Sequence, residues 1–425
     1  MLKVVKILII LIIFASVGHA FLSGPQEDRR NSINIAFGDL HTHSNYGDGV
    51  LSPKELYEQA KLKGLNFLSI NEHHFYFQYD STQAKEKTKL PPYAKFSRTD
   101  LTGAARLESY FNSYKSSLTL MDESFVPLIG LEVYPDKDFG SFSFINMTEL
   151  IPKELMNDPR TVLEKIKVLN AKSNIVGIFN HPMIPSGREK IFGRNTIFES
   201  DKKFVTFWKD LISLMEIKCG PMDHGKYFWK AEKVNQFQSL NKVYIDVWLE
   251  FLSMGFKLAP IYDQCGHSAV IGNRSSGRTA VYYEGEYTQE KLLKALKNRH
   301  TYATEDLNLS IKALVNEHFL PGDELTLKGG EELNWKIEIS DTDEPEAIYE
   351  IAVWKNPVSF DNPNKREAIK SLVREKNQFS FSISFDGPQK SSYYILVIEQ
   401  QSVDPINHSK KNRTIFAPIW VNRAL

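Results

Sequence analysis

The sequence predicts an α/β fold, in which a β/α barrel is followed by a small C-terminal antiparallel β-sandwich. Short apolar segments alternate with helical patterns over the first three quarters of the chain, which is typical of a parallel sheet or barrel. Six of these segments end in His, Glu, Asp or Cys, and such folds gather functional residues at the carboxyl ends of their strands. From about residue 306 the pattern changes to short β-rich segments separated by turn residues.

Length and composition indicate a globular protein of two or three domains. The chain has 425 residues, of which 42% are hydrophobic and 24% are charged, so a disordered or fibrous protein is excluded. Lys and Arg together number 52, and so do Asp and Glu, which leaves no net charge to favour nucleic acid or an anionic membrane. We therefore expect no nucleic-acid groove.

The first twenty residues are typical of a secretory signal peptide. Lys3 and Lys6 precede an apolar run over residues 7–14, and the small residues Gly18 and Ala20 provide a cleavage site. An uncleaved anchor is the alternative, but a membrane-spanning helix needs about 20 apolar residues. The sequence thus predicts a secreted or periplasmic protein with no stable membrane span after cleavage.

The first strand and helix of the mature chain have clear boundaries. The strand has the sequence "INIAFGDLH", beginning at residue 33. Ser52, Pro53 and Glu55 then form a capping-box start for a helix through Lys63, and Gly64 follows it. We expect the polar segment between strand and helix to lie at the carboxyl end of the barrel.

Five later segments repeat this pattern of an apolar strand with a polar end. They read "LNFLSINEHH", "FVPLIGLEVY", "NIVGIFNHP", "LISLMEIKCG" and "FKLAPIYDQCGH". Helices are predicted between several of them, at about residues 100–118, 159–171 and 228–254. A last helix within residues 288–304 closes the first domain, so the predicted division is a signal peptide (1–20), a barrel domain (21–305) and a β-sandwich (306–425).

The first strand end carries a candidate metal site. His41 and His43 are two residues apart on an extended segment, so their side chains point the same way. Asp48 lies in the turn "YGDG", which can bring a carboxylate back to the same place. Imidazole and carboxylate are the ordinary ligands of zinc and related metals. Taken singly, each of these residues also fits an ordinary turn or strand end.

These motifs resemble the polymerase and histidinol phosphatase (PHP) superfamily, whose first motif is H-x-H followed by an aspartate. Within it, "GDLHTHSNYGDG", "NHP", "GRTAVY", "TYAT" and the terminal "PIWV" look most like the CehA/McbA-type metallohydrolases, over about residues 35–425. The resemblance implies a distorted, TIM-like PHP-type barrel with two, or as many as three, divalent metal ions. It also implies hydrolysis, usually of phosphate esters.

The resemblance also implies a set of site residues. Glu132 matches the bridging acid, and we expect Glu132, Asp48 and His181 to act in catalysis. The implied metal ligands are His41, His43, Asp48, His73, Glu132, His181 and His267, with Asp263 or Cys265 as the last member.

Three positions depart from the family pattern. Glu72 stands before His73 where Asp is common, and we expect it to orient the imidazole from behind the metal. Ser143 stands where many relatives have another histidine, which weakens a third metal position. Cys265 stands two residues before His267 in place of an aspartate. It can bind zinc as a thiolate, form a disulfide with Cys219, or stay an inert thiol, and the sequence leaves these alternatives open.

The predicted function is that of an exported metal-dependent hydrolase, a phosphomono- or diesterase that acts through a hydroxide bridging two metals on a small phosphate-containing ester. Zinc is the first expectation for the metal, with manganese or iron as alternatives. Arg274, Arg278 and His300 are candidates to bind the phosphate. The alternatives are an ester, amide or carbamate hydrolase of the same fold, and a degenerate binding protein without catalysis.

Overall fold

The computed structural model describes most of the chain after residue 28. The described residues are 29–78, 101, 103–134, 141–156, 158–182, 209–220, 244–267, 271–272, 277–344, 346–360, 368–374, 379–401 and 411–424. The predicted signal peptide and Arg274 lie outside them. Among the described residues, no helix is both long and apolar enough to cross a membrane.

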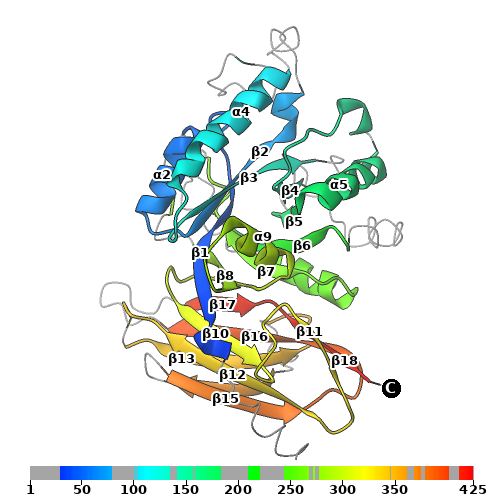
Figure 1. Ribbon diagram of the computed structural model, residues 1–425. Helices are drawn as coiled ribbons and strands as arrows, with labels where there is room; N and C mark the ends of the chain where they lie inside the picture. Colours follow the sequence, from blue (N-terminus) through cyan, green and yellow to red (C-terminus); the bar gives the residue numbers. More distant parts are fainter. Residues whose placement is uncertain are drawn as a thin grey trace, which may run out of the picture.

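In the described part of the chain, seven strands form the barrel, which confirms the predicted α/β fold (Figure 1). Their order in the sheet follows the chain: β1 Ile33–Thr42, β2 Phe67–His73, β3 Val126–Val133, β4 Ser141–Ile145, β5 Val176–Asn180, β6 Ile212–Cys219 and β7 Ala259–Asp263. All neighbours are parallel except β4, which runs antiparallel to both β3 and β5 and distorts the barrel. A parallel bridge between Thr42 and Gly266 joins the end of β1 to the segment after β7 and closes the sheet at its carboxyl edge.

The described helices lie close to their predicted positions, and residues 228–243 of the helix predicted at 228–254 lie outside the described residues. α2 spans Pro53–Leu62 and begins with the predicted capping box, in which Ser52 and Glu55 bond to each other's backbone N–H. α4 spans Gly103–Ser117, α5 spans Pro159–Ser173, and residues 244–253 are helical. In Figure 1, α2 and α4 lie beside each other next to β2 and β3, while α5 lies next to β4 and β5. Short 3₁₀ turns complete the set: η1 Arg29–Asn31, η2 His74–Phe77, η4 Leu118–Leu120 and η5 Lys153–Leu155.

Apolar side chains from alternate residues of the strands fill the interior of the barrel at its amino end. Inward positions such as Leu128, Ile178 and Ile261 form one buried apolar cluster. α9, Gln289–Lys297, adds Leu292 and Leu296 to this cluster. Because apolar side chains occupy the amino-end layers, the polar inward positions are confined to the carboxyl end.

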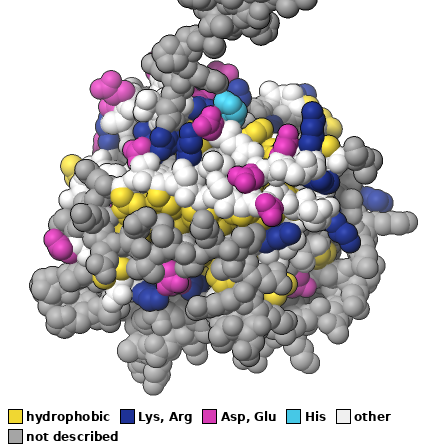
Figure 2. Space-filling model, turned by 90° about the horizontal axis from the view of Figure 1, so that it is seen from below, with side chains coloured by type: hydrophobic (Ala, Val, Ile, Leu, Met, Phe, Trp, Pro, Cys, Tyr) yellow, Lys and Arg dark blue, Asp and Glu magenta, His cyan; other side chains and the backbone are white. Residues whose placement is uncertain are grey.

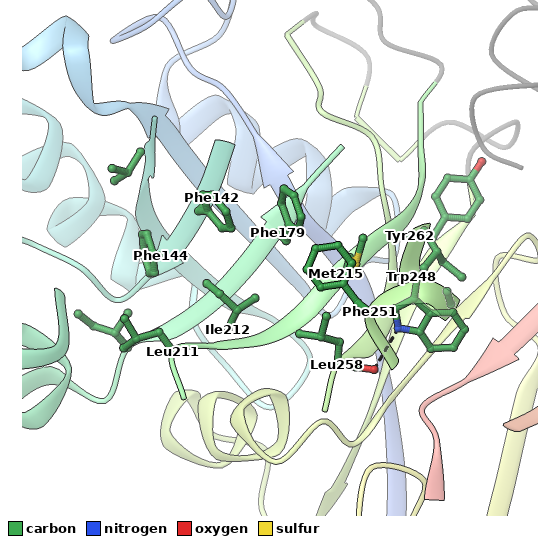
Figure 3. Close-up of a cluster of buried hydrophobic side chains, with 14 of the residues drawn as sticks. Phe142, Phe144, Phe179, Leu211, Ile212, Met215, Trp248, Phe251, Leu258 and Tyr262 are labelled. Carbon is green, nitrogen blue, oxygen red and sulfur yellow. Dashed lines mark hydrogen bonds between the residues drawn. The ribbon is translucent and has the colours of Figure 1, made fainter. Parts of the chain in front are cut away.

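A second apolar cluster packs the outer face of the barrel, where the helix of residues 244–253 covers β5 and β6 (Figure 3). Phe142 and Phe179 stack with their ring centroids 4.7 Å apart, and Phe251 meets Phe179 edge-on at 5.7 Å. The indole N–H of Trp248 donates to the carbonyl of Leu258 at 3.1 Å. The polar atom of this large buried side chain is thereby satisfied.

The C-terminal strands form two layers around a third cluster. One layer is the three-stranded antiparallel sheet of β10 Ser310–Val315, β12 Glu332–Ser340 and β15 Phe379–Asp386. The other layer contains β11 Glu324–Leu327, β13 Ile348–Lys355, β14 Ala368–Arg374, β16 Ser392–Gln401, β17 Lys411–Phe416 and β18 Ile419–Arg423. Figure 2 looks onto this end of the molecule, where acidic and basic side chains are mixed.

This second layer continues the sheet of the barrel. β17 pairs with β9 Thr301–Thr304, β9 pairs with β8 Arg278–Glu284, and β8 pairs antiparallel with residues 33–38 of β1. The sheet therefore crosses the predicted boundary at residues 305–306 without a break.

Candidate metal centre

The end of β1 turns two histidines into the carboxyl mouth of the barrel. The pairing of β1 with β2 shifts register between Asp39 and Thr42, and such a bulge re-aims the side chains that follow it. His41 and His43 are fully buried, and their Nε2 atoms lie 3.1 Å apart. The predicted common direction of the two side chains is therefore present.

The ends of β2 and β3 bring Glu132 and His73 to the same place. Glu132 Oε2 lies 2.6 Å from His73 Nδ1, 3.6 Å from His43 Nε2 and 3.7 Å from His41 Nε2. The other carboxylate oxygen, Oε1, lies 3.5 Å from His181 Nε2. Glu132 thus lies among four imidazoles.

The turn after β1 returns Asp48 to the cluster. Its Oδ1 lies 3.0 Å from His267 Nδ1, and its Oδ2 lies 3.6 Å from His73 Nε2. The turn is tight because a side-chain carbon on Gly49 would lie 2.1 Å from the carbonyl oxygen of His43. A backbone hydrogen bond from Val50 to His267 fixes the turn against the segment after β7.

The segment after β7 supplies Cys265 and His267. The Cys265 sulfur lies 3.6 Å from His267 Nε2. A side-chain hydrogen bond with Cys219 lowers the pKa of the Cys265 thiol well below its ordinary value, although burial opposes this. Both cysteines are buried and no disulfide joins them, so the disulfide alternative is not present in this structure.

The structure brings eight of the nine predicted ligands into four overlapping triads whose ligand atoms lie within 4.8 Å of one another. These triads are His41–His181–Cys265, His43–Cys265–His267, His41–His43–Glu132 and His43–Asp48–His73.

Asp263 is the predicted ligand that lies apart from the triads. It is the last residue of β7, where its Oδ1 accepts hydrogen bonds from the backbone N–H of Leu40 and from the hydroxyl of Thr279. Burial and the neighbouring Asp39 raise the pKa of Asp263 well above its ordinary value. Through its bond to Leu40, this carboxyl group joins the end of β7 to β1.

Two predicted phosphate-binding residues also lie elsewhere. Arg278 is 3% exposed, and its guanidinium donates to the carbonyls of Gly272 and Gly277. His300 lies 2.8 Å from the carboxylate of Asp323, beyond the end of α9. These positions favour structural roles for Arg278 and His300 because both side chains are bound to other parts of the fold.

Other residues hold the ligands from outside. Glu216, on β6, lies 2.6 Å from His41 Nδ1 and also accepts the backbone N–H of His181. Asn180 donates to Glu132 Oε1 at 3.1 Å and to Ser143 at 2.9 Å. Tyr134 donates to the same Glu132 oxygen at 3.1 Å. Sequence reasoning did not single out Glu216, although its strand had been identified by its polar end.

Two departures from the family pattern have a structural explanation. Glu72 accepts the backbone N–H of Ser44 at 2.5 Å, and its other oxygen lies 3.9 Å from His43 Nδ1. The expectation that Glu72 orients His73 is therefore wrong. Glu72 faces His43, because it points to the opposite side of β2 from His73. Ser143 bonds to Asn180 and belongs to none of the triads.

The buried cluster attracts positive charge. Although burial opposes ionisation, Asp48 raises the pKa of His267 to about 10. Burial also opposes the charge of His181, but hydrogen bonds to Cys265 and Glu132 raise its pKa to about 9. The histidines in turn lower the pKa of Glu132 well below its usual range, against the effect of burial.

These residues fit divalent metal ions. Glu132 Oε2 is buried and makes no hydrogen bond to the described part of the chain, although three imidazoles surround it. In tetrahedral zinc with bonds of about 2.0–2.1 Å, two ligand atoms lie about 3.4 Å apart, which is close to the 3.6 and 3.7 Å that separate Oε2 from His43 and His41. Because Glu216 faces His41 Nδ1, the proton of His41 lies on Nδ1 and the lone pair of Nε2 is directed at His43 Nε2. A cation bound by these nitrogens would remove the repulsion between them.

The fold and the cluster define a β/α-barrel protein with a candidate polynuclear metal centre. No family model matches the chain, and no curated protein matches it. Among solved structures, it is similar to a two-domain protein from Bacteroides vulgatus described as containing a predicted PHP-like metal-dependent phosphoesterase. That likeness has 12% identity and a TM-score of 0.43, and it covers 90% of this chain and 95% of the other.

Two further structures are less similar. One is a provisionally assigned metal-dependent phosphoesterase from Bifidobacterium adolescentis, with 11% identity, a TM-score of 0.26, and coverage of 61% of this chain and 95% of the other. The other is an amidohydrolase from Chromobacterium violaceum with bound sulfate and no metal, with 11% identity, a TM-score of 0.28, and coverage of 56% and 90%. At these TM-scores the functional case rests on the site itself.

Proposed function

We propose that this protein is a metal-dependent hydrolase of small phosphate esters. The observation that carries the proposal is the convergence of eight His, Asp, Glu and Cys side chains, in four overlapping triads, at the carboxyl mouth of the barrel. The choice of phosphate esters is supported by the motif resemblance of "GDLHTHSNYGDG" to the PHP superfamily.

The chain's own residues would hold and orient the reacting groups. When bound, divalent metal ions supply Lewis acidity and lower the pKa of water. His41, His43, His73 and His181 would present their imidazoles around the Glu132 carboxylate, which Asn180 and Tyr134 fix by hydrogen bonds to Oε1. Glu216 keeps the proton of His41 on Nδ1, so that Nε2 stays available as a ligand.

Substrate would approach where the cluster retains some exposure. Phe75, Tyr134 and His181 are partly exposed, whereas His41, His43 and Glu132 are fully buried. Phe75 stacks on His73 with a centroid separation of 5.1 Å, and Tyr134 lies 6.0 Å from Phe75. This aromatic edge suits an ester with an aryl or other apolar leaving group.

The deciding experiment is a substrate panel with metal-reconstituted protein. Aryl phosphomonoesters and phosphodiesters are assayed beside aryl carboxylic esters and carbamates, and we expect turnover of the phosphate esters. Glu132→Gln should abolish that turnover, while the same substitution at Glu332, an exposed residue on β12, should leave it unchanged. Turnover of the carbon esters alone would replace the phosphoesterase proposal with the ester, amide or carbamate alternative.

Metal analysis tests the non-catalytic alternative. We expect the purified or reconstituted protein to hold close to two equivalents of a divalent metal. Less than one equivalent after reconstitution would contradict the proposal and favour a binding protein.

We also propose that the protein is exported. The proposal is supported by the basic, apolar and small residues in the sequence of residues 1–20. Mass spectrometry of protein recovered from the extracytoplasmic fraction of a bacterial host should show a chain that begins after Ala20. An intact chain in the cytoplasmic fraction would contradict export.

A further inference from the structure

We infer that the Cys265 sulfur is shared by two metal ions and that this bridging thiolate makes the centre select zinc-like ions over magnesium. The inference deepens the proposed function and rests on it in one respect, which is that the centre holds two divalent ions. It concerns a residue at which the chain departs from the motif that it otherwise resembles.

The position of Cys265 in the cluster carries the first step. Its sulfur belongs to two triads, one with His41 and His181 and one with His43 and His267. Apart from Cys265, these two triads have no member in common. They therefore describe two separate ion positions that meet at one sulfur.

The chemistry of the shared atoms carries the second step. His43 also belongs to more than one triad, but an imidazole nitrogen has a single lone pair and binds one ion. A thiolate sulfur has several lone pairs, so it can bind two ions at once. Cys265 is therefore the side chain at this junction that can bridge through a single atom.

The surroundings fix the sulfur at that junction. Backbone hydrogen bonds join Gly266 to both His41 and His43, so the residue next to Cys265 is tied to the end of β1. Cys265 has a left-handed backbone with φ of 47°, which side chains rarely adopt without a local reason. Asp263 belongs to none of the triads, and its Oδ1 is bound to Leu40 and Thr279.

Metal preference follows from the donor atom. Magnesium demands oxygen ligands in octahedral geometry, whereas zinc and iron accept thiolate together with imidazole. A sulfur shared by both ions affects both positions at once. Replacing it with a carboxylate, as in Cys265→Asp, should restore an oxygen donor and weaken the preference for zinc.

Cadmium-113 NMR of the full chain loaded with two equivalents of ¹¹³Cd²⁺ tests the bridge. Sulfur ligation moves a cadmium resonance downfield, so we expect two downfield resonances that are scalar-coupled to each other. Both should move upfield in Cys265→Asp. Both should stay downfield in the matched variant Cys219→Ser, because the Cys219 side chain belongs to none of the triads and a serine hydroxyl can still donate a hydrogen bond to the Cys265 sulfur. A shift of only one resonance, or of none, would overturn the bridge.

Two further measurements complete the test. Unmodified protein loaded with Co²⁺ should show a thiolate-to-cobalt charge-transfer band, and this readout does not depend on whether a variant folds; its absence would overturn the inference. In equilibrium dialysis against zinc and manganese together, the zinc-to-manganese ratio in the protein should fall at least about tenfold in Cys265→Asp. An unchanged ratio would contradict the role in selectivity.

The bridge and the proposed function can fail separately. Sulfur-shifted cadmium resonances in a protein that hydrolyses none of the esters would support the bridge and sink the hydrolase proposal. Hydrolysis by a protein without sulfur-shifted resonances would do the reverse.

Discussion

Glu216 sets the orientation of two ligands with one buried carboxylate. One oxygen faces His41 Nδ1 at 2.6 Å, and the other accepts the backbone N–H of His181. Glu216→Gln replaces one of the two carboxylate oxygens with an N–H₂ group. That group donates hydrogen bonds, so it would face another N–H donor at either His41 or His181 and one of the two contacts would be lost. We expect the affinity for zinc to fall about 10- to 100-fold.

Competition with a chromophoric zinc chelator measures that change. Glu284→Gln is the matched control because Glu284 lies on β8, where it forms a partly exposed ion pair with Arg29. The control should bind zinc as the unmodified protein does. Equal affinities in Glu216→Gln and the control would contradict the role given to Glu216.

Asp341 should make stability depend on pH outside the metal centre. Burial raises its pKa to about 7, and a hydrogen bond to Asp343 and the charge of Asp306 add to the effect. Because the folded-state pKa lies above the ordinary value of 3.8, the protonated carboxyl favours the folded state, and stability is lost as pH rises through about 7.

Thermal unfolding at several pH values measures this loss. Asp341→Asn stays uncharged, and its amide oxygen can still accept from Tyr349 and Gln400, which donate to Asp341 Oδ2. We expect the variant to be more stable than the unmodified protein at pH 8, with the difference shrinking toward pH 4. The same substitution at the exposed Asp386 should give no such trend, and a difference that does not vary with pH would refute the prediction.

Local spacing and the family resemblance named the residues that gather in the cluster, but not the residues that support them. His41 and His43 were predictable because period-two geometry is local to one strand. Glu216 and Asp263 are both buried carboxylates on neighbouring strands, and the sequence alone does not show which side chains each one meets. These contacts separate their roles, because Glu216 faces His41 Nδ1 while Asp263 Oδ1 accepts the backbone N–H of Leu40.

At the scale of elements, a capping box at the start of α2 stabilises this helix, which follows the Asp48 turn. Ser52 accepts the backbone N–H of Glu55, and the Glu55 side chain accepts the backbone N–H of Ser52. Ser52→Ala removes the first of these bonds, so we expect the free energy of unfolding to fall by about 1 kcal/mol. The metal content should not change, because no ligand lies on α2.

Denaturant unfolding with parallel metal analysis checks this prediction. Ser116→Ala is the control, since Ser116 is an exposed residue of α4 whose hydroxyl bonds to its own helix. A loss of stability no larger than in the control would contradict the capping role. A loss of metal would show that α2 also positions the Asp48 turn.

Element type was predictable where it depends on local pattern, and strand pairing was not. The capping box located α2 to within a residue. The antiparallel direction of β4 and the bulge in β1 depend on neighbours that are distant in the sequence, so neither could be predicted. Both matter for the site, because the bulge re-aims His41 and β4 places Ser143 beside Asn180.

At the scale of the whole molecule, the predicted boundary at residues 305–306 marks a change of pattern within one continuous sheet. The third apolar cluster contains Ile33, Tyr282 and Tyr302 from before that boundary together with Trp335 and Ile398 from after it. Removing the C-terminal strands would expose the first group of side chains to water. Neither the sheet nor this cluster follows from local sequence, because β17 and β9 are about a hundred residues apart.

The continuous sheet predicts that metal bound in the barrel also stabilises the C-terminal strands. A ligand that binds only the folded state at about 100 times its Kd stabilises that state by about 2.7 kcal/mol. β1 carries His41 at one end and pairs with β8 at the other, β8 pairs with β9, and β9 pairs with β17. Unfolding of the barrel would therefore remove the strand pairing that holds β8, β9 and β17 in the sheet. We therefore expect one calorimetric endotherm, and we expect all of it to move to higher temperature when zinc is added to the metal-free protein. A second endotherm that stays in place on addition of zinc would show that the C-terminal strands unfold on their own, and the shared apolar cluster would then contribute little to the cooperativity of the chain.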